Sequence, residues 1–170
     1  MKNSKINFQL FPQTQKPTEV MNNVIEVFRN NQDKIDSTKN TWDSNKVLEL
    51  LSDDLKRIGF DVEKNKKNKL KFGVLYGLNG KAQKSFDVDA FHAGEKIILE
   101  IEAGRAVANN QFLKDFFEAC VIPDAENLII AVRNIYNDSN DFEKVINYFE
   151  TLYTSNRLQI PLKRLLVIGY

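Results

Sequence analysis

The sequence has little of the chemistry on which several protein classes depend: its 170 residues include one cysteine and one histidine. Because Cys120 has no second cysteine to pair with, an intramolecular disulfide and a cysteine-based zinc site are excluded. No apolar run approaches the roughly 20 residues that a helix needs to span a bilayer, which excludes a transmembrane protein. The residues after Met1 are polar, so we expect no signal peptide. We therefore expect a cytoplasmic protein.

Net charge is also nearly absent, since 24 lysine and arginine residues stand against 23 aspartate and glutamate residues. The balance of +1 argues against a dominant attraction of the whole protein to nucleic acid or to a membrane. It conceals a basic segment from Lys56 to Lys84, in which nine basic residues face only Asp61 and Glu63, a local charge of 9 − 2 = +7. Two interpretations stay open: the segment neutralises phosphates, or its densest part, residues 64–69, is a solvated loop.

The chain does contain enough apolar residues for a core: 42% are hydrophobic, which excludes general disorder. The first 17 residues include Pro12 and Pro17, and we expect them to be irregular. Apolar residues at helical spacing predict helices over residues 18–29, 44–58, 110–121 and 141–152. Alternating patterns and short apolar runs predict strands over residues 60–63, 70–76, 85–91, 96–102, 127–132 and 165–168.

Residues at the ends of the predicted helices support these bounds. Thr18 can cap the first helix and Asp141 the last, because short polar side chains accept hydrogen bonds from the free amides of a first turn. Asn109 or Asn110 can do the same for the third helix. Gly59 can end the second helix, since glycine readily adopts the left-handed conformation found there.

The order of these elements, α-α-β-β-β-β-α-β-α-β, predicts an α/β or α+β fold. A run of antiparallel strands followed by helix–strand alternation favours a mixed β-sheet flanked by helices on both faces. We expect residues 1–40 to form an N-terminal extension with one helix and residues 41–170 to form the main domain.

Carboxylates alternate with apolar residues along the two strands that a short turn joins, over residues 86–102. Gly94-Glu95 suits a two-residue type II′ turn, so residues whose numbers sum to 189 face each other. This register places Asp89 opposite Glu100 and puts both on one face of the sheet. The same face receives Asp87, opposite Glu102. The other face receives the apolar residues: Phe86, Val88, Ala90, Ile97, Leu99 and Ile101.

This gathering of carboxylates predicts a bound cation. Directly paired residues have their Cβ atoms about 4.5–5.5 Å apart, and like charges at that spacing destabilise a sheet. Hard oxygen ligands, few enough to leave room for water, suit Mg²⁺ or Mn²⁺. The alternative is an exposed amphipathic hairpin whose polar face is merely acidic, although lysine or threonine would serve that purpose better.

An aspartate in one strand, a hairpin turn and then Glu-x-(Lys or Glu) in the next strand resemble the motif of the PD-(D/E)xK nuclease superfamily. In this sequence the motif would be Asp89, followed by Glu100-Ile101-Glu102. The order of elements from about Ser44 to Val132, roughly half of the chain, resembles that superfamily's core and leaves residues 1–40 outside. The resemblance implies a restriction endonuclease-like fold and a Mg²⁺-dependent DNA endonuclease, such as a type II restriction enzyme.

The sequence departs from the superfamily's pattern at two positions. No proline precedes Asp89, and Glu102 stands where most members have lysine. Restriction endonucleases of the BamHI and BglII group also lack that lysine and carry Glu or Gln there, so the sequence most resembles that group. The resemblance implies that Asp89 and Glu100 hold Mg²⁺, and that Glu102 binds metal or takes a proton from the attacking water.

Further site residues are assigned from the resemblance. Glu49, on the second predicted helix, would complete the metal site, or it is an exposed helix residue. Arg105 would contact the scissile phosphate, or it pairs with a nearby acid. His92 lies at the turn and is expected to have a structural or solvent-exposed role. The loop lysines would position duplex DNA: Lys64, Lys66, Lys67 and Lys69.

The resemblance also implies a homodimer that acts on double-stranded DNA, without a membrane partner. Two alternatives stay open. The first is a catalytically inactive nuclease-fold domain that binds DNA or another protein, which the missing lysine and the modest length favour. The second is a repair or RNA-directed nuclease with the same site, for which cleavage of flap, nicked or RNA substrates would be the sign.

Overall fold

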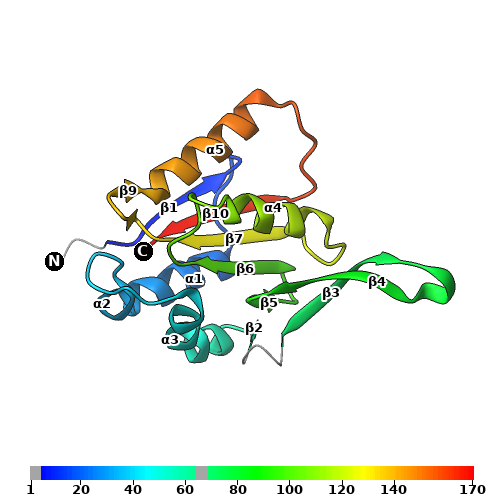
Figure 1. Cartoon of the computed structure of the whole chain (residues 1–170), viewed down its shortest axis with the longest axis horizontal. Helices are drawn as coiled ribbons and strands as arrows, with labels where there is room; N and C mark the ends of the chain where they lie inside the picture. Colours follow the sequence, from blue (N-terminus) through cyan, green and yellow to red (C-terminus); the bar gives the residue numbers. More distant parts are fainter. Residues whose placement is uncertain (1–4, 64–68) are drawn as a thin grey trace.

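The fold is mixed α+β, built on a six-stranded sheet between two layers of helices (Figure 1). The computed structural model describes residues 5–63 and 69–170. The strands of the sheet are β1 (Asn7–Phe11), β2 (Asp61–Val62), β5 (Ala90–His92), β6 (Ile97–Glu102), β7 (Asn127–Val132) and β10 (Arg164–Gly169). Their spatial order is β1-β10-β7-β6-β5-β2, with β10, β7 and β6 mutually parallel, whereas the β1–β10, β6–β5 and β5–β2 pairs are antiparallel. The mixed sheet predicted from the element order is therefore present.

Two smaller ribbons lie outside this sheet. The longer one pairs β3 (Leu70–Tyr76) with β4 (Ala82–Val88), joined through the short 3₁₀ helix η1 (Leu78–Gly80). Figure 1 shows this ribbon extending away from the rest of the molecule, beyond the β5 edge of the sheet. The shorter one pairs β8 (Ile135–Tyr136) with β9 (Ser139–Asn140).

Helices cover both faces of the sheet (Figure 1). On one face lie α1 (Glu19–Asn30), α2 (Gln32–Ile35) and α3 (Ser44–Arg57), and on the other lie α4 (Gln111–Val121) and α5 (Asp141–Ser155). Successive residues of β7 divide between the two apolar clusters: Ile129 belongs with α1 and α3, whereas Ile130 belongs with α4 and α5. All six residues of β7 are buried, as expected for a parallel strand covered on both sides. None of the helices in residues 5–63 and 69–170 has the length and apolar character to cross a membrane.

Local signals at the ends of the first two long helices are confirmed. The Thr18 hydroxyl accepts a hydrogen bond of 3.2 Å from the backbone amide of Met21, which satisfies one free donor of the first turn of α1. The Asp43 carboxylate, a cap that the predictions did not include, accepts the corresponding bond, 2.8 Å long, from the amide of Lys46 at the start of α3. Gly59 follows α3 with a positive φ of 96°, a conformation that costs glycine little.

The interpretation of residues 1–17 as irregular is wrong, because residues Asn7–Phe11 form the edge strand β1. Its hydrogen bonds come from β10, about 160 residues later in the chain, so no neighbouring segment indicates the pairing. Ile6 and Leu10 pack in the same apolar cluster as Val24 of α1 and Leu51 of α3. The segment before residue 41 therefore contributes both to the central sheet and to its core.

Three details of the later helices also differ from the predictions. Asn110 precedes α4 with a positive φ of 53°, and its side chain makes no capping bond. The cap of α5 is Asn140, which accepts a bond from the amide of Glu143, because the Asp141 carboxylate instead accepts one from the Ser139 hydroxyl. The spacing of the apolar residues of α4 predicts that Phe117 packs inward with Phe112 and Phe116, but 58% of its surface is exposed.

Candidate active site

The hairpin of β5 and β6 pairs in the predicted register: Ala90 lies opposite Leu99, and His92 lies opposite Ile97. The predicted two-residue type II′ turn is wrong, however. Residues 93–96 form a longer turn, in which Lys96, with φ 51°, adopts the left-handed conformation. The register survives because a slip of one residue would turn the buried apolar residues of β6 toward the wrong face.

Asp89 lies at a bend between two strands. The predicted strand 85–91 is broken there, because β4 leaves the sheet to pair with β3. As a result Asp87 lies opposite Lys71, so its predicted pairing with Glu102 is wrong. Val88 and Ala90 also belong to different apolar clusters, although an unbroken strand would have placed them on one face.

Two backbone hydrogen bonds fix Asp89 at this bend. Its Oδ2 atom accepts a bond of 2.8 Å from the amide of Ile101, in β6. Its carbonyl oxygen accepts a second bond of 2.8 Å from the amide of Glu63, just beyond β2. If the hairpin continued in the same register, Ile101 would pair with Val88. Because Val88 pairs with Leu70 of β3 instead, the Asp89 carboxylate accepts the hydrogen bond of the Ile101 amide in place of a backbone carbonyl. Asp89 is thus bound to the strand that carries Glu100 and Glu102.

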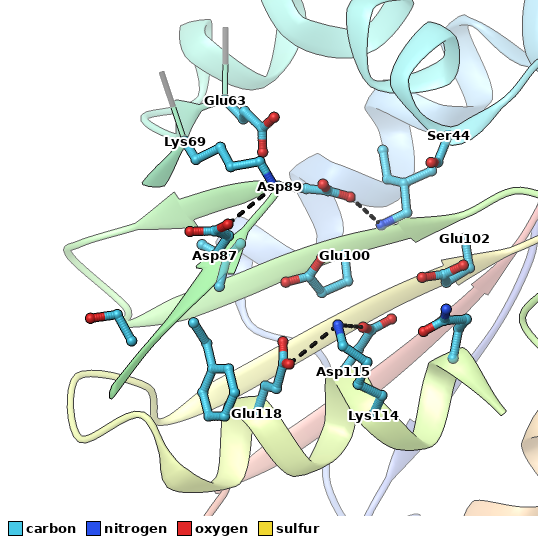
Figure 2. Close-up of a pocket in the computed structure, with 15 residues that line it drawn as sticks. Ser44, Glu63, Lys69, Asp87, Asp89, Glu100, Glu102, Lys114, Asp115 and Glu118 are labelled. Atoms are coloured by element: carbon cyan, nitrogen blue, oxygen red, sulfur yellow. Dashed lines mark hydrogen bonds and ion pairs between the residues drawn. The ribbon is translucent and has the colours of Figure 1, made fainter. Parts of the chain in front are cut away.

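The predicted carboxylates meet in a pocket of about 340 Å³ between the hairpin and α4 (Figure 2). Glu100 and Glu102 have the same strand parity as Ile98, whose side chain lies on the α4 side of the sheet. Helix α4 forms the opposite wall and contributes further charged side chains. The carboxyl groups that line the pocket are those of Glu63, Asp87, Asp89, Glu100, Glu102, Asp115 and Glu118, and its ammonium groups are those of Lys69 and Lys114.

Burial and mutual repulsion shift the titration of this cluster. Burial, followed by the charges of Asp115 and Glu63, raises the pKa of Asp89 to about 7. Burial, followed by the neighbouring carboxyl of Glu102, raises the pKa of Asp115 to about 8. The pKa of Glu100 lies well above its usual range, because the side chain is enclosed by protein and repelled by Asp89. Without a cation, part of this cluster therefore holds protons near neutral pH.

The two lysines of the pocket neutralise its rim more than its centre. Lys69 lies 3.1 Å from an oxygen of Asp87, and Lys114 lies 3.2 Å from an oxygen of Glu118. Within residues 5–63 and 69–170, no lysine or arginine forms a salt bridge with Asp89 or Glu100. Among the described residues, the three carboxylates of the predicted motif, Asp89, Glu100 and Glu102, therefore have no salt-bridge partner.

The donor set fits a hard divalent cation. The Oδ2 atom of Asp115 is buried and has no hydrogen-bond partner, although unpaired buried polar atoms are rare. Among the described residues, no three histidine, cysteine, aspartate or glutamate side chains form a ready-made metal cage. Mg²⁺ does not require one, since it keeps several waters and is commonly held by one or two carboxylates. Asp89 and Glu100, with Glu102 beside them, supply oxygen donors of that kind.

The structure does not bring all of the predicted residues to the pocket. Glu49 lies on the outer side of α3, 69% exposed and 3.0 Å from Lys46, because the neighbouring Leu48 and Leu51 occupy the buried face. Arg105 is exposed and does not line the pocket. Lys69 does line it, whereas the other predicted DNA-binding lysines lie outside the described residues: Lys64, Lys66 and Lys67.

His92 has the structural role that its position at the turn predicted. Its ring packs against Phe60, with centroids 5.2 Å apart, and its Nδ1 atom accepts a hydrogen bond of 3.1 Å from the amide of Glu95. The histidine therefore fixes the turn between β5 and β6 and does not line the pocket.

The contribution of α4 was not predicted from the sequence, although a signal for it exists. Gln111, Lys114, Asp115 and Glu118 follow the spacing i, i+3, i+4, i+7 and therefore form one polar stripe along the helix. The apolar residues Phe112, Leu113, Phe116 and Phe117 predict the helix but do not show what its polar side chains contact. Asp115 and Glu118 are both buried. Because buried polar groups need polar partners, such a stripe indicates polar side chains on the strand that α4 covers.

No protein-family model matches the chain, and a search of curated proteins finds no match. The function is therefore inferred from the pocket itself, from its charges and from the elements that hold them.

Proposed function

We propose that this protein is a metal-dependent endonuclease that hydrolyses phosphodiester bonds of double-stranded DNA. One observation carries the proposal: three carboxylates, Asp89, Glu100 and Glu102, are gathered at the end of one hairpin, where burial raises the pKa of each. Such an arrangement destabilises the metal-free protein, and perturbed carboxylates in a cleft are typical of functional sites.

Asp89 and Glu100 would hold Mg²⁺ or Mn²⁺, since they line the pocket together and form no salt bridge with any residue that the structure describes. The metal would lower the pKa of a bound water and neutralise charge on the phosphate. The hydrogen bond from the Ile101 amide orients Asp89 toward this task. Ordered carboxylates of this kind reduce the rearrangement that binding requires.

Glu102 would take the proton of the attacking water. Burial raises the pKa of Glu102, and the Asp115 carboxyl lies within hydrogen-bonding reach of it. A base whose pKa lies closer to neutrality accepts a proton more effectively at physiological pH than an ordinary glutamate. With a pKa of about 8, the Asp115 carboxyl would already carry a proton near neutral pH, and it would donate a hydrogen bond that orients Glu102.

Lys114 would supply the positive charge that the motif lacks at position 102. Its ammonium group enters the pocket from α4 and bonds to Glu118, 3.2 Å away, and it lies 3.9 Å from an oxygen of Asp115. A cation at this wall of the pocket can stabilise the negative charge that develops on a phosphate during hydrolysis.

The topology supports the restriction endonuclease-like interpretation of the fold. A helix (α3), the carboxylate hairpin, a second helix (α4) and a parallel strand (β7) follow one another in the order that the resemblance implies. The homodimer stays a prediction, as does the division of the chain at residue 40.

Cleavage of supercoiled and linear plasmid DNA with Mg²⁺ or Mn²⁺ tests the proposal. Wild-type protein and a Glu150→Gln control, which changes an exposed residue of α5, should both cut. Glu100→Ala should not. Discrete fragments would indicate a sequence-specific enzyme.

No cleavage of DNA by the wild type, together with no metal binding in calorimetry, would contradict the nuclease assignment. The non-catalytic binding domain would then be the better interpretation. Metal-dependent cleavage restricted to RNA, flap or nicked substrates would keep the site but change the substrate class.

A further inference from the structure

The ribbon of β3, η1 and β4, residues 70–88, is a basic surface with no established partner; we call it the arm. Between residues 70 and 86 it carries three lysines, Lys71, Lys81 and Lys84, and no acidic residue. All three are exposed. In the part of the chain that the structure describes, none of them forms a salt bridge, unlike Lys69 at the base of the arm. Lys84 lies over the ring of Phe86, 5.1 Å from its centroid, a contact that leaves its charge unneutralised, so all three cations are available to a polyanion.

The tip of the arm exposes apolar side chains. Leu78 is 86% exposed, Tyr76 58% and Leu75 55%, which makes Leu78 the most exposed of the large hydrophobic residues in the described chain. The Tyr76 hydroxyl donates a hydrogen bond to the carbonyl of Gly73, which holds the phenol ring against the arm. Exposed apolar side chains that lie close together in this way are typical of an interaction site.

Aromatic contacts fix the base of the arm beside the pocket. Phe72 packs edge-on against Phe91 of β5, with centroids 4.8 Å apart, and Phe86 contacts Phe117 of α4 at 6.3 Å. Asp87, near the end of β4, lines the pocket. Since strands rise about 3.4 Å per residue, seven residues reach about 24 Å from that base. The arm thus starts at the proposed active site and projects away from it (Figure 1).

We propose that the arm enters a groove of duplex DNA, with its lysines on the phosphates and Leu78 against the bases. This inference rests on the proposed function and names the part of the protein that holds the substrate. A two-stranded ribbon fits the major groove, which is about 12 Å wide. Apolar side chains also act as wedges between base steps in architectural DNA-binding proteins. A second copy of the chain, with a net charge of only +1, offers no comparable attraction to an unpaired cationic surface.

Binding of a fluorescein-labelled duplex of about 30 base pairs, followed by anisotropy in EDTA over a range of salt concentrations, separates the arm from catalysis. The variants are Lys81→Gln/Lys84→Gln and Leu78→Ser. The control, Lys16→Gln/Lys144→Gln, removes the same charge from exposed lysines outside the arm. Plasmid cleavage with Mg²⁺ is measured in parallel for every protein.

The double lysine variant should bind at least about fivefold more weakly, and its plot of log affinity against log salt should lose about 0.9 in slope for each phosphate contact removed. Leu78→Ser should weaken binding with little change in that slope. The control should match the wild type. Weaker binding by the arm variants supports the arm even if the wild type cuts no DNA, which would overturn only the nuclease assignment.

Equal DNA binding by wild type, arm variants and control would overturn the arm proposal while leaving the nuclease assignment to the cleavage assay. Sedimentation of wild type and Leu78→Ser decides what the tip contacts instead. A dimer that Leu78→Ser dissociates, with DNA binding unchanged, would make the tip a contact between copies and would also overturn the proposal.

Discussion

The Oδ2 atom of Asp89 accepts a hydrogen bond of 2.8 Å from the backbone amide of Ile101, the residue that separates Glu100 from Glu102. One contact therefore joins the bend that ends the arm to the strand that carries the other two motif carboxylates. It orients Asp89 without neutralising it, because an amide supplies no net charge. The sheet therefore holds the carboxylates together against their mutual repulsion.

Glu100→Gln should abolish cleavage and stabilise the metal-free protein. Glutamine keeps the shape of the side chain and removes a carboxylate whose pKa is raised by burial and by Asp89. We expect the free energy of unfolding at about pH 8 to rise by about 1–3 kcal/mol, the scale of relieving an unsatisfied buried polar group. Thermal melts in EDTA measure this, with Glu150→Gln as the control. A lower melting temperature for Glu100→Gln would show that the charge is well accommodated.

Stability of the metal-free protein should fall as pH rises from about 4 to about 8. The folded-state pKa values of Asp89 and Asp115, about 7 and about 8, lie above the ordinary aspartate value of 3.8. Groups with a raised pKa stabilise the fold fully below the unfolded pKa, and that stability is lost as pH rises through the folded pKa. Melting curves across this range in EDTA give the trend.

Mg²⁺ at about 10 mM should restore the stability that is lost at higher pH. The stabilisation by Mg²⁺ should be larger at alkaline than at neutral pH, because fewer protons must leave the carboxyl groups when the ion binds. The same melting curves with Mg²⁺ provide the measurement. A melting temperature that is independent of both pH and Mg²⁺ would contradict a divalent-cation site in the pocket.

Lys114→Met should reduce the rate of cleavage by about 100-fold, the loss observed when one group that stabilises transition-state charge is removed. Methionine keeps much of the length of the side chain but not its ammonium group. The change should appear in kcat, with KM nearly constant, because the lysine acts on charge that develops during the reaction. Lys144→Met, on an exposed position of α5, is the matched control. A rise in KM alone would mean that Lys114 binds DNA and takes no part in hydrolysis.

Asp36→Asn should destabilise the protein at neutral pH but not in strong acid. Burial raises the pKa of Asp36, but hydrogen bonds from Lys5 and Thr38 outweigh it and lower the pKa to about 2. The stability from this site is present above the unfolded pKa of 3.8 and is lost as pH falls toward 2. We expect a loss of about 1–2 kcal/mol at neutral pH. Urea titrations at several pH values, with Asp53→Asn as the control, should show the two curves converging below about pH 3.

The hairpin and most helices could be predicted from the sequence because their signals are local. The capping residues Thr18 and Asp43 precede their helices directly, and the register of β5 and β6 follows from which residues must be buried. The gathering of Asp89 and Glu100 in one pocket followed from that register and is confirmed.

The features that were missed depend on contacts between distant segments. The bend at Asp89 arises because β4 finds its partner in β3, a competition that alternation within residues 85–91 does not reveal. Strand β1 exists because β10 pairs with it. The place of Glu49 in the chain order does not reveal its direction, because the angle of each residue around α3 decides which side chains face the sheet and which face solvent. The presence of Asp115 in the pocket depends on which helix packs over the hairpin, and no local pattern in the sequence shows this.

Only Asp89 separates Val88, the last residue of β4, from Ala90, the first residue of β5. The residue that connects the arm to the sheet is therefore also a residue of the pocket. Because the carbonyl and the carboxylate of Asp89 are both bonded to neighbouring backbone, a rotation of the arm about this point must either turn Asp89 or break one of its two hydrogen bonds. A molecule that binds the arm and reorients it would therefore also move the Asp89 carboxylate, so the bend couples the orientation of the arm to the geometry of the pocket.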